Sequence, residues 1–266
     1  MPCINGFQCM QLLRDGLAQA ATVADTPIAF AAHTGQRFDI VATLERSSSE
    51  SKLIGRVDRG VRSAADLKGR RVGFLRGTVS HYYLDTFLLL SDVDAALVQR
   101  VPLSYTDVAG ALVRGEIDAA SLNQPNAARA LAALGPQAVV LPMARVYTLA
   151  AHLISLPADQ GVSDETLRRL LRALLRGQQL LDQQPAASRA WLAQRMKLDP
   201  EVARASFDDM SFRIDLDQSL IATLERQSRW AQREGLVPAG PVPDYLARVR
   251  SGPLRSVAPR AVSLVE

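Results

Sequence analysis

Short apolar runs alternate with amphipathic stretches over the first 145 residues of the chain. The apolar run at 72–75 predicts a buried strand, and the stretch 80–90 that follows it predicts a helix. The alternation continues with predicted strands at 97–102, 117–122 and 138–141 and predicted helices at 106–114 and 126–134. Strands and helices in this order are typical of parallel α/β units, so the pattern predicts an α/β fold.

The hydrophobic period changes to that of a helix from about residue 162. Ser163 and the two acidic residues after it are typical of a helix start, and leucines recur at 167, 170, 171, 174 and 175 as on one helix face. Further helices are predicted at 185–196, 200–205 and 217–235. The tail 240–262 is rich in proline and glycine, and we expect it to wrap over the surface.

One part of the pattern occurs twice. The stretch 12–32, "LLRDGLAQAATVADTPIAFAA", resembles 112–133, "LVRGEIDAASLNQPNAARALAA", and indicates two lobes built alike. The later copy follows a predicted strand, helix and strand at 72–102, whereas only about ten residues precede the earlier copy. We therefore expect the first lobe to be N-terminally incomplete, without its opening strand–helix–strand.

The composition excludes several classes of protein. The chain is 48% hydrophobic and 22% charged, which predicts a sizeable core. Aromatic residues make up only 5%, and the net charge of +4 comes from arginines scattered among acidic residues, so we expect no nucleic-acid partner. With no apolar run long enough to cross a bilayer and no signal-peptide pattern at its start, the chain is expected to be soluble.

Two cysteines and three histidines offer little chemistry. Cys3 and Cys9 allow one disulfide, and the histidines do not stand at the spacing of metal ligands, so we expect no metal and no cofactor. Common catalytic motifs such as G-x-S-x-G and H-E-x-x-H are absent from the sequence, and we assign no catalytic residue. The run 46–51, "RSSSES", lines a ligand site or forms a solvated loop, and we favour the loop slightly.

The most informative stretch is the predicted strand-to-helix turn "RGTVSH" at 76–81. The first turn of a helix leaves backbone N–H groups unpaired, and here no acidic residue follows before Asp85, so the turn suits an anion. Capping of the helix by Thr78 or Ser80 explains the residues equally well. If the turn binds an anion, replacing both residues by alanine weakens binding and leaves folding nearly intact. The candidate ligand residues of this turn are Gly77, Thr78, Val79, Ser80 and His81.

Two further turns carry polar residues where a predicted strand ends and a helix begins. Asp25 and Thr26 stand in the earlier copy of the repeat, and Asn123 and Gln124 in the later copy. Ligands of open parallel sheets bind at the carboxyl ends of strands, so these four residues are candidate ligand residues too. For any one turn alone, ordinary helix capping by Asp25 or Asn123 is an alternative.

The order of these motifs resembles the periplasmic solute-binding proteins of ABC transporters, in the nitrate/sulfonate/taurine and thiamine-precursor-like group. The resemblance rests on "ADTPIAFAA" at 24–32, "DLKGRRVGFLRGTVSHYYL" at 66–84, "ALVRGEIDAASLNQP" at 111–125 and "DLDQSLIATLERQSRWAQREGLVP" at 215–238. Family members often carry Trp or Glu before the proline of the third motif, where this chain has Asn123 and Gln124.

The resemblance implies a type II periplasmic-binding-protein fold: a first lobe at 1–70, a second lobe at 71–142, and a return to the first lobe with C-terminal helices at 143–266. It places the crossovers near 69–74 and 141–146. The implied function is binding of a small organic anion, such as a sulfonate, taurine or nitrate, between the lobes by hinge closure. The implied partner is a membrane permease. The protein itself is expected to be a monomer in the periplasm. An enzyme on the same fold, similar to a desulfinase or a pyrimidine-precursor synthase, and a non-transport sensor are the alternatives.

Overall fold

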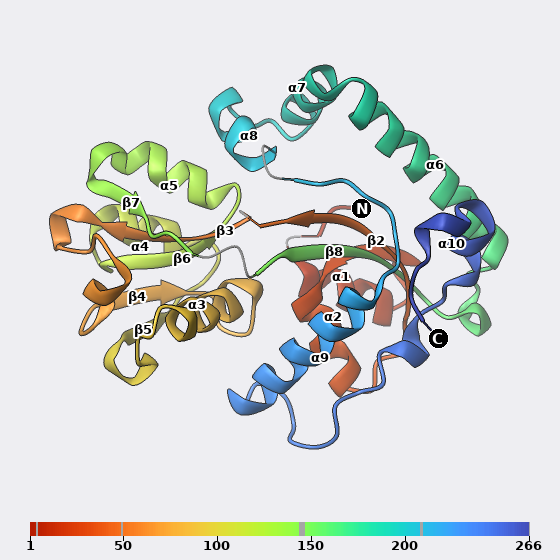
Figure 1. Ribbon diagram of the computed structural model, residues 1–266, viewed down its shortest axis with the longest axis horizontal. Coiled ribbons are helices and arrows are strands. Elements are labelled where there is room, and N and C mark those ends of the chain that lie inside the picture. Colours follow the sequence, from red (N-terminus) through yellow and green to blue (C-terminus); the bar gives the residue numbers. More distant parts are fainter. Residues whose placement is uncertain (4, 49, 144–146, 208–209, 266) are drawn as a thin grey trace. The chain divides into compact units, whose positions relative to one another are not determined.

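The computed structural model describes residues 1–265 except 4, 49, 144–146 and 208–209 (Figure 1). The strands are β1 (Ala20–Ala24), β2 (Asp39–Ser47), β3 (Ser51–Arg56), β4 (Arg71–Phe74), β5 (Gln99–Pro102), β6 (Ala119–Asn123), β7 (Ala138–Val140) and β8 (Leu149–Ser155). The helices are α1 (Gly6–Arg14), α2 (Asp25–His33), α3 (Val79–Leu90), α4 (Val108–Arg114), α5 (Asn126–Leu134), α6 (Asp164–Gln183), α7 (Pro185–Arg195), α8 (Pro200–Phe207), α9 (Gln218–Arg233) and α10 (Gly252–Val257).

The chain forms two compact units. Unit 1 consists of Met1–Arg46, Ala150–Ser188 and Ser211–Glu266, and unit 2 consists of Ser47–Leu149 and Arg189–Met210. Unit 2 begins earlier than the expected second lobe because β3 pairs antiparallel with both β6 and β7. It also includes α8, which packs on α5.

The first expected crossover falls elsewhere in the chain. The first, expected near 69–74, lies inside unit 2, because this stretch forms β4 between β5 and β6. The chain instead leaves unit 1 after Arg46 and re-enters it at Ala150. Residues 144–146 of the expected second crossover lie outside the described residues.

Unit 1 is built on a sheet with the strand order β1-β8-β2. Strands β1 and β8 are antiparallel, with Ala24 opposite Ala151. Helix α2 packs on α1 and α9, while α6 packs on α10, and Figure 1 shows the last two side by side. The leucine stripe of α6 faces the core as predicted, with Leu167 and Leu171 fully buried. The tail does more than cover the surface, because Leu254 of α10 belongs to the core of this unit.

Unit 2 is built on a sheet with the strand order β5-β4-β6-β3-β7. Strand β4 runs parallel to β5 and β6, but β3 is antiparallel to its neighbours, so the sheet is mixed and not purely parallel. Side chains alternate across β6 as a strand requires. Ala120 and Leu122 pack with α4 and α5, whereas the Ser121 hydroxyl contacts α3 on the other face.

The sequence repeat corresponds to a repeated helix–strand–helix unit. The earlier copy is α1, β1 and α2, and the later copy is α4, β6 and α5. Strand β6 lies between β4 and β3, whereas β1 lies at the edge of its sheet. The expectation that the first lobe lacks an opening strand–helix–strand stays a prediction.

Candidate functional site

Helix α3 begins without a side-chain cap. Thr78 occupies the capping position with an extended backbone, but its hydroxyl donates to the Leu75 carbonyl at 2.7 Å and does not cap the helix. No acidic residue lies in the first turn. Gly77 has a φ of +75°, a left-handed conformation that glycine adopts without the strain of other residues. The capping alternative therefore does not explain this turn, and its amides carry the positive end of the helix dipole.

The two polar turns of unit 2 lie next to each other. Strands β4 and β6 are parallel neighbours, so their carboxyl ends meet at the same edge of the sheet. The Ser80 hydroxyl donates to the Ser121 carbonyl at 2.7 Å, and the Ser121 hydroxyl donates to the Ser80 carbonyl at 2.8 Å. Both side chains are buried, so this pair of bonds fixes the start of α3 against the end of β6.

His81 is built into the turn itself. The Gly77 N–H donates to His81 Nδ1 at 3.3 Å, which leaves the proton on Nε2, 3.4 Å from the Asp85 carboxylate. The imidazole also packs on the Phe74 ring, with 4.5 Å between the ring centroids, and the residue is buried. These contacts hold the turn in shape from its inner side.

Asn123 and Gln124 have different partners. The Asn123 amide donates to the Ser51 hydroxyl at 2.9 Å, so Asn123 does not cap α5. The Gln124 side-chain carbonyl accepts from the Ala128 N–H at 3.1 Å, within the first turn of α5. Ser51 and Ser47 are buried, so the preference for a solvated loop at 46–51 is wrong for these two residues.

The polar side chains of the unit 1 turn, Asp25 and Thr26, also form hydrogen bonds within their own unit. Asp25 is the first residue of α2, and its carboxylate accepts from His152 Nε2 at 2.8 Å and from the Ala150 N–H at 3.1 Å. The Thr26 hydroxyl donates to the Gln227 side-chain carbonyl at 2.6 Å. All of these side chains are buried, and neither Asp25 nor Thr26 caps α2.

Three tyrosines form an aromatic cluster in unit 2. The ring of Tyr147 lies 5.4 Å from that of Tyr82 and 6.1 Å from that of Tyr83, both edge to face. Burial raises the pKa of Tyr83 to about 12, so its phenol stays neutral at physiological pH. The sequence did not indicate this cluster, although two of its members directly follow His81.

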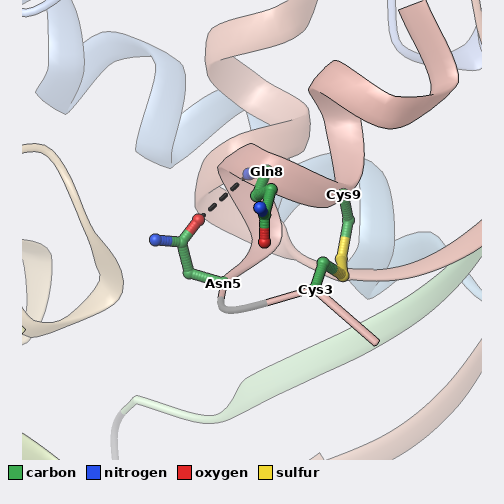
Figure 2. Close-up of a disulfide and its surroundings, with 4 residues drawn as sticks. All are labelled: Cys3, Asn5, Gln8 and Cys9. Atoms are coloured by element: carbon green, nitrogen blue, oxygen red, sulfur yellow. Dashed lines mark hydrogen bonds between the residues drawn. A yellow bond between two sulfur atoms is a disulfide. The ribbon is translucent and has the colours of Figure 1, made fainter. Parts of the chain in front are cut away.

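Cys3 and Cys9 form a disulfide (Figure 2). Within the loop that it closes, the Asn5 side chain accepts from the Gln8 N–H at 3.0 Å and caps α1. The nucleophile of a cysteine enzyme is a free thiolate, so neither cysteine serves as one in this state.

The predicted ligand residues thus divide between the units. Asp25 and Thr26 belong to unit 1, and the candidates of both later turns, 77–81 and 123–124, belong to unit 2. The structure brings the two unit 2 turns together and bonds Asp25 to His152, which the sequence did not indicate as a partner.

Across the part of the chain that the structure describes, no helix is both long and apolar enough to cross a membrane.

Two α/β units joined by a chain that passes repeatedly between them define the class of the protein, the α/β periplasmic-binding-protein fold. The chain belongs to the NMT1/THI5 like family, whose sequence profile matches residues 5–188. The family and the fold expected from the sequence are both confirmed. A search of curated proteins by sequence returns no match.

Similar solved structures include binding proteins and an enzyme. The alkanesulfonate-binding protein SsuA from Xanthomonas axonopodis pv. citri, bound to MOPS, has 20% identity over 93% of this chain and 86% of its own, with a TM-score of 0.75. The periplasmic aliphatic sulphonate binding protein SsuA from Escherichia coli has 21% identity over 92% and 79%, with a TM-score of 0.77. A cysteine-to-serine mutant of DszB in complex with biphenyl-2-sulfinic acid has 17% identity over 96% and 90%, with a TM-score of 0.71.

Proposed function

We propose that this protein is the solute-binding component of an ABC importer and that it binds a small organic anion, such as a sulfonate. Family membership and the shared fold of the two sulfonate-binding proteins support this assignment. The observation that carries the choice of an anion is the start of α3, where neither a side-chain cap nor an acidic residue occupies the first turn. A helix start of this kind binds anions through backbone N–H groups and the helix dipole.

In this proposal the ligand contacts both units and thereby favours a closed arrangement. Unit 2 supplies the amides at the start of α3 and the adjacent turn at Asn123 and Gln124, and unit 1 supplies the turn at Asp25 and Thr26. A ligand shifts such an equilibrium only by its difference in affinity for the two arrangements, so contacts from both units are essential. The closed form then engages a membrane permease, and we place this monomeric protein in the periplasm.

An enzyme on this fold is the second candidate, because the sulfinic-acid complex of DszB shares the architecture. A cysteine-dependent desulfination requires a free thiolate near the ligand. Both cysteines of this chain are paired in the disulfide at the start of α1. This observation favours a binding protein over a cysteine enzyme. The neighbouring genes distinguish an importer component from a sensor without transport, since a gene beside those of a permease and an ATPase favours import.

The test places a carboxylate of the protein itself at the capping position of α3, where Thr78 makes no capping hydrogen bond. Thr78→Asp places an N-cap acceptor and a negative charge where the anion is proposed to bind, and the extended backbone of Thr78 suits such a cap. We expect folding to be retained and binding of ethanesulfonate or MOPS, measured by calorimetry, to be lost. Ser163→Asp is the matched control, because it exchanges one cap for another at the start of α6 in unit 1.

Two results contradict the proposal. Equal sulfonate affinity for the wild type and Thr78→Asp removes the start of α3 from the site. A wild-type protein that binds no aliphatic sulfonate, sulfinate or nitrate in a thermal-shift panel overturns the assignment to small anions.

A further inference from the structure

A chain of buried hydrogen bonds runs through unit 1 from strand β2 to the first residue of α2. Thr43 Oγ1 lies 3.1 Å from His152 Nδ1, and His152 Nε2 lies 2.8 Å from the Asp25 carboxylate. The second carboxylate oxygen accepts from the Ala150 N–H. Thr43, His152 and Asp25 are each at most 1% exposed. We call these three residues the Thr43–His152–Asp25 chain.

The three groups can bond in one continuous series. With the ring proton on Nε2, His152 donates to the Asp25 carboxylate, and Nδ1 accepts from the Thr43 hydroxyl. The imidazole is therefore held at both nitrogens, and each carboxylate oxygen of Asp25 lies within hydrogen-bond distance of a donor.

Two of the three residues lie close to the points where the main chain passes between the units, and the third begins the candidate ligand turn of unit 1. The main chain leaves unit 1 after Arg46, three residues beyond Thr43, and it re-enters at Ala150, two residues before His152. Asp25 opens the turn that is the candidate ligand turn of unit 1. The hydrogen bonds thus join this turn to both strands, β2 and β8, through which unit 1 is connected to the first and longest segment of unit 2.

We infer that Asp25 and His152 are positioning residues, which fix the start of α2 against β2 and β8, and that Asp25 does not itself contact the ligand. The Asp25 side chain is fully buried, and both of its carboxylate oxygens already accept hydrogen bonds inside unit 1. This inference rests on the proposed function only for its statement about the ligand. The statement about positioning concerns the unliganded protein and is tested separately.

The first experiment measures amide hydrogen exchange of α2 without any ligand. Thr43→Val removes the hydroxyl at nearly constant shape, and Thr43→Ser keeps it. Ser163→Ala is the control, because it also deletes one hydroxyl hydrogen bond of unit 1, the cap of α6, a helix that packs on α10. We expect exchange of the α2 amides to be about tenfold faster in Thr43→Val, near the wild-type rate in Thr43→Ser, and unchanged in Ser163→Ala. Equal α2 exchange in Thr43→Val and Ser163→Ala overturns the inference.

The second experiment measures the affinity for ethanesulfonate and MOPS in the same variants. We expect about tenfold weaker binding by Thr43→Val and unchanged binding by Ser163→Ala, although both variants lose stability. Faster α2 exchange with unchanged affinity overturns the link between this turn and the ligand. A wild type that binds no member of the panel of aliphatic sulfonates, sulfinates and nitrate refutes the proposed function instead, and the exchange data then still decide whether the Thr43–His152–Asp25 chain positions α2.

Discussion

Ser80→Ala tests how the start of α3 is held. The substitution deletes the hydroxyl that donates to the Ser121 carbonyl at 2.7 Å and that accepts from the Leu75 N–H at 3.4 Å. The site is buried, so water does not replace these bonds. A typical hydrogen bond contributes about 1 kcal/mol net, and a buried partner left unsatisfied costs about 1–3 kcal/mol. We therefore expect Ser80→Ala to lower the free energy of unfolding by about 1–3 kcal/mol.

Urea unfolding followed by circular dichroism measures this loss. Ser104→Ala is the matched control, because it removes an exposed serine hydroxyl of unit 2 and is expected to change stability by less than about 0.5 kcal/mol. A loss for Ser80→Ala no larger than for Ser104→Ala refutes the reasoning. The structure thus revises the expectation from sequence that replacing Ser80 leaves folding nearly intact.

Two further predictions concern unit 1. Burial raises the pKa of the Glu45 carboxyl, so its ionisation costs stability once the pH rises above the unfolded-state pKa. Glu45→Gln should therefore stabilise the protein at pH 7 but not below about pH 4, and an equal gain in urea unfolding at both pH values contradicts this. Replacing Cys3 and Cys9 by serine opens a short loop and should cost about 2 kcal/mol, with unfolding then insensitive to dithiothreitol; an unchanged midpoint contradicts it.

Elements with local signals were predictable from the sequence. The predicted helix at 126–134 is α5 within the same bounds, with Pro125 before it and Gly135 after it. The start of α6 was predicted correctly because Ser163 caps it through the Thr166 N–H. Such caps and breakers act within a few residues, so a sequence displays them directly.

Strand β3 had no such signal. Its sequence, "SKLIGR", contains two basic residues and a glycine, and its place in unit 2 depends on pairing with β6, in which Ser51 lies opposite Asn123. A partner that far along the chain is set by tertiary packing and not by local preference. The expected boundary of the second lobe was therefore too late, because the strand that begins unit 2 was not recognised.

The candidate site shows the same division between local and distant information. The three strand-to-helix turns were found because polar residues and proline interrupt apolar runs locally. The partners of their side chains were not predicted, because Asp25 bonds to a histidine 127 residues away and Thr26 bonds to a glutamine 201 residues away. Residue type alone does not show whether a hydroxyl or carboxylate is free for a ligand or already bonded within the fold.

These partners change which atoms of the proposed site face the ligand. The side chains of Ser80, His81 and Asp25 form hydrogen bonds within their own units and shape the turns. The backbone amides at the start of α3, by contrast, meet neither a side-chain cap nor a first-turn acid. A site that recognises an anion mainly through amides keeps its affinity when a neighbouring side chain is shortened and loses it when a carboxylate takes the place of the ligand. Thr78→Asp is for this reason a sharper test of the proposed function than alanine substitution in the same turn.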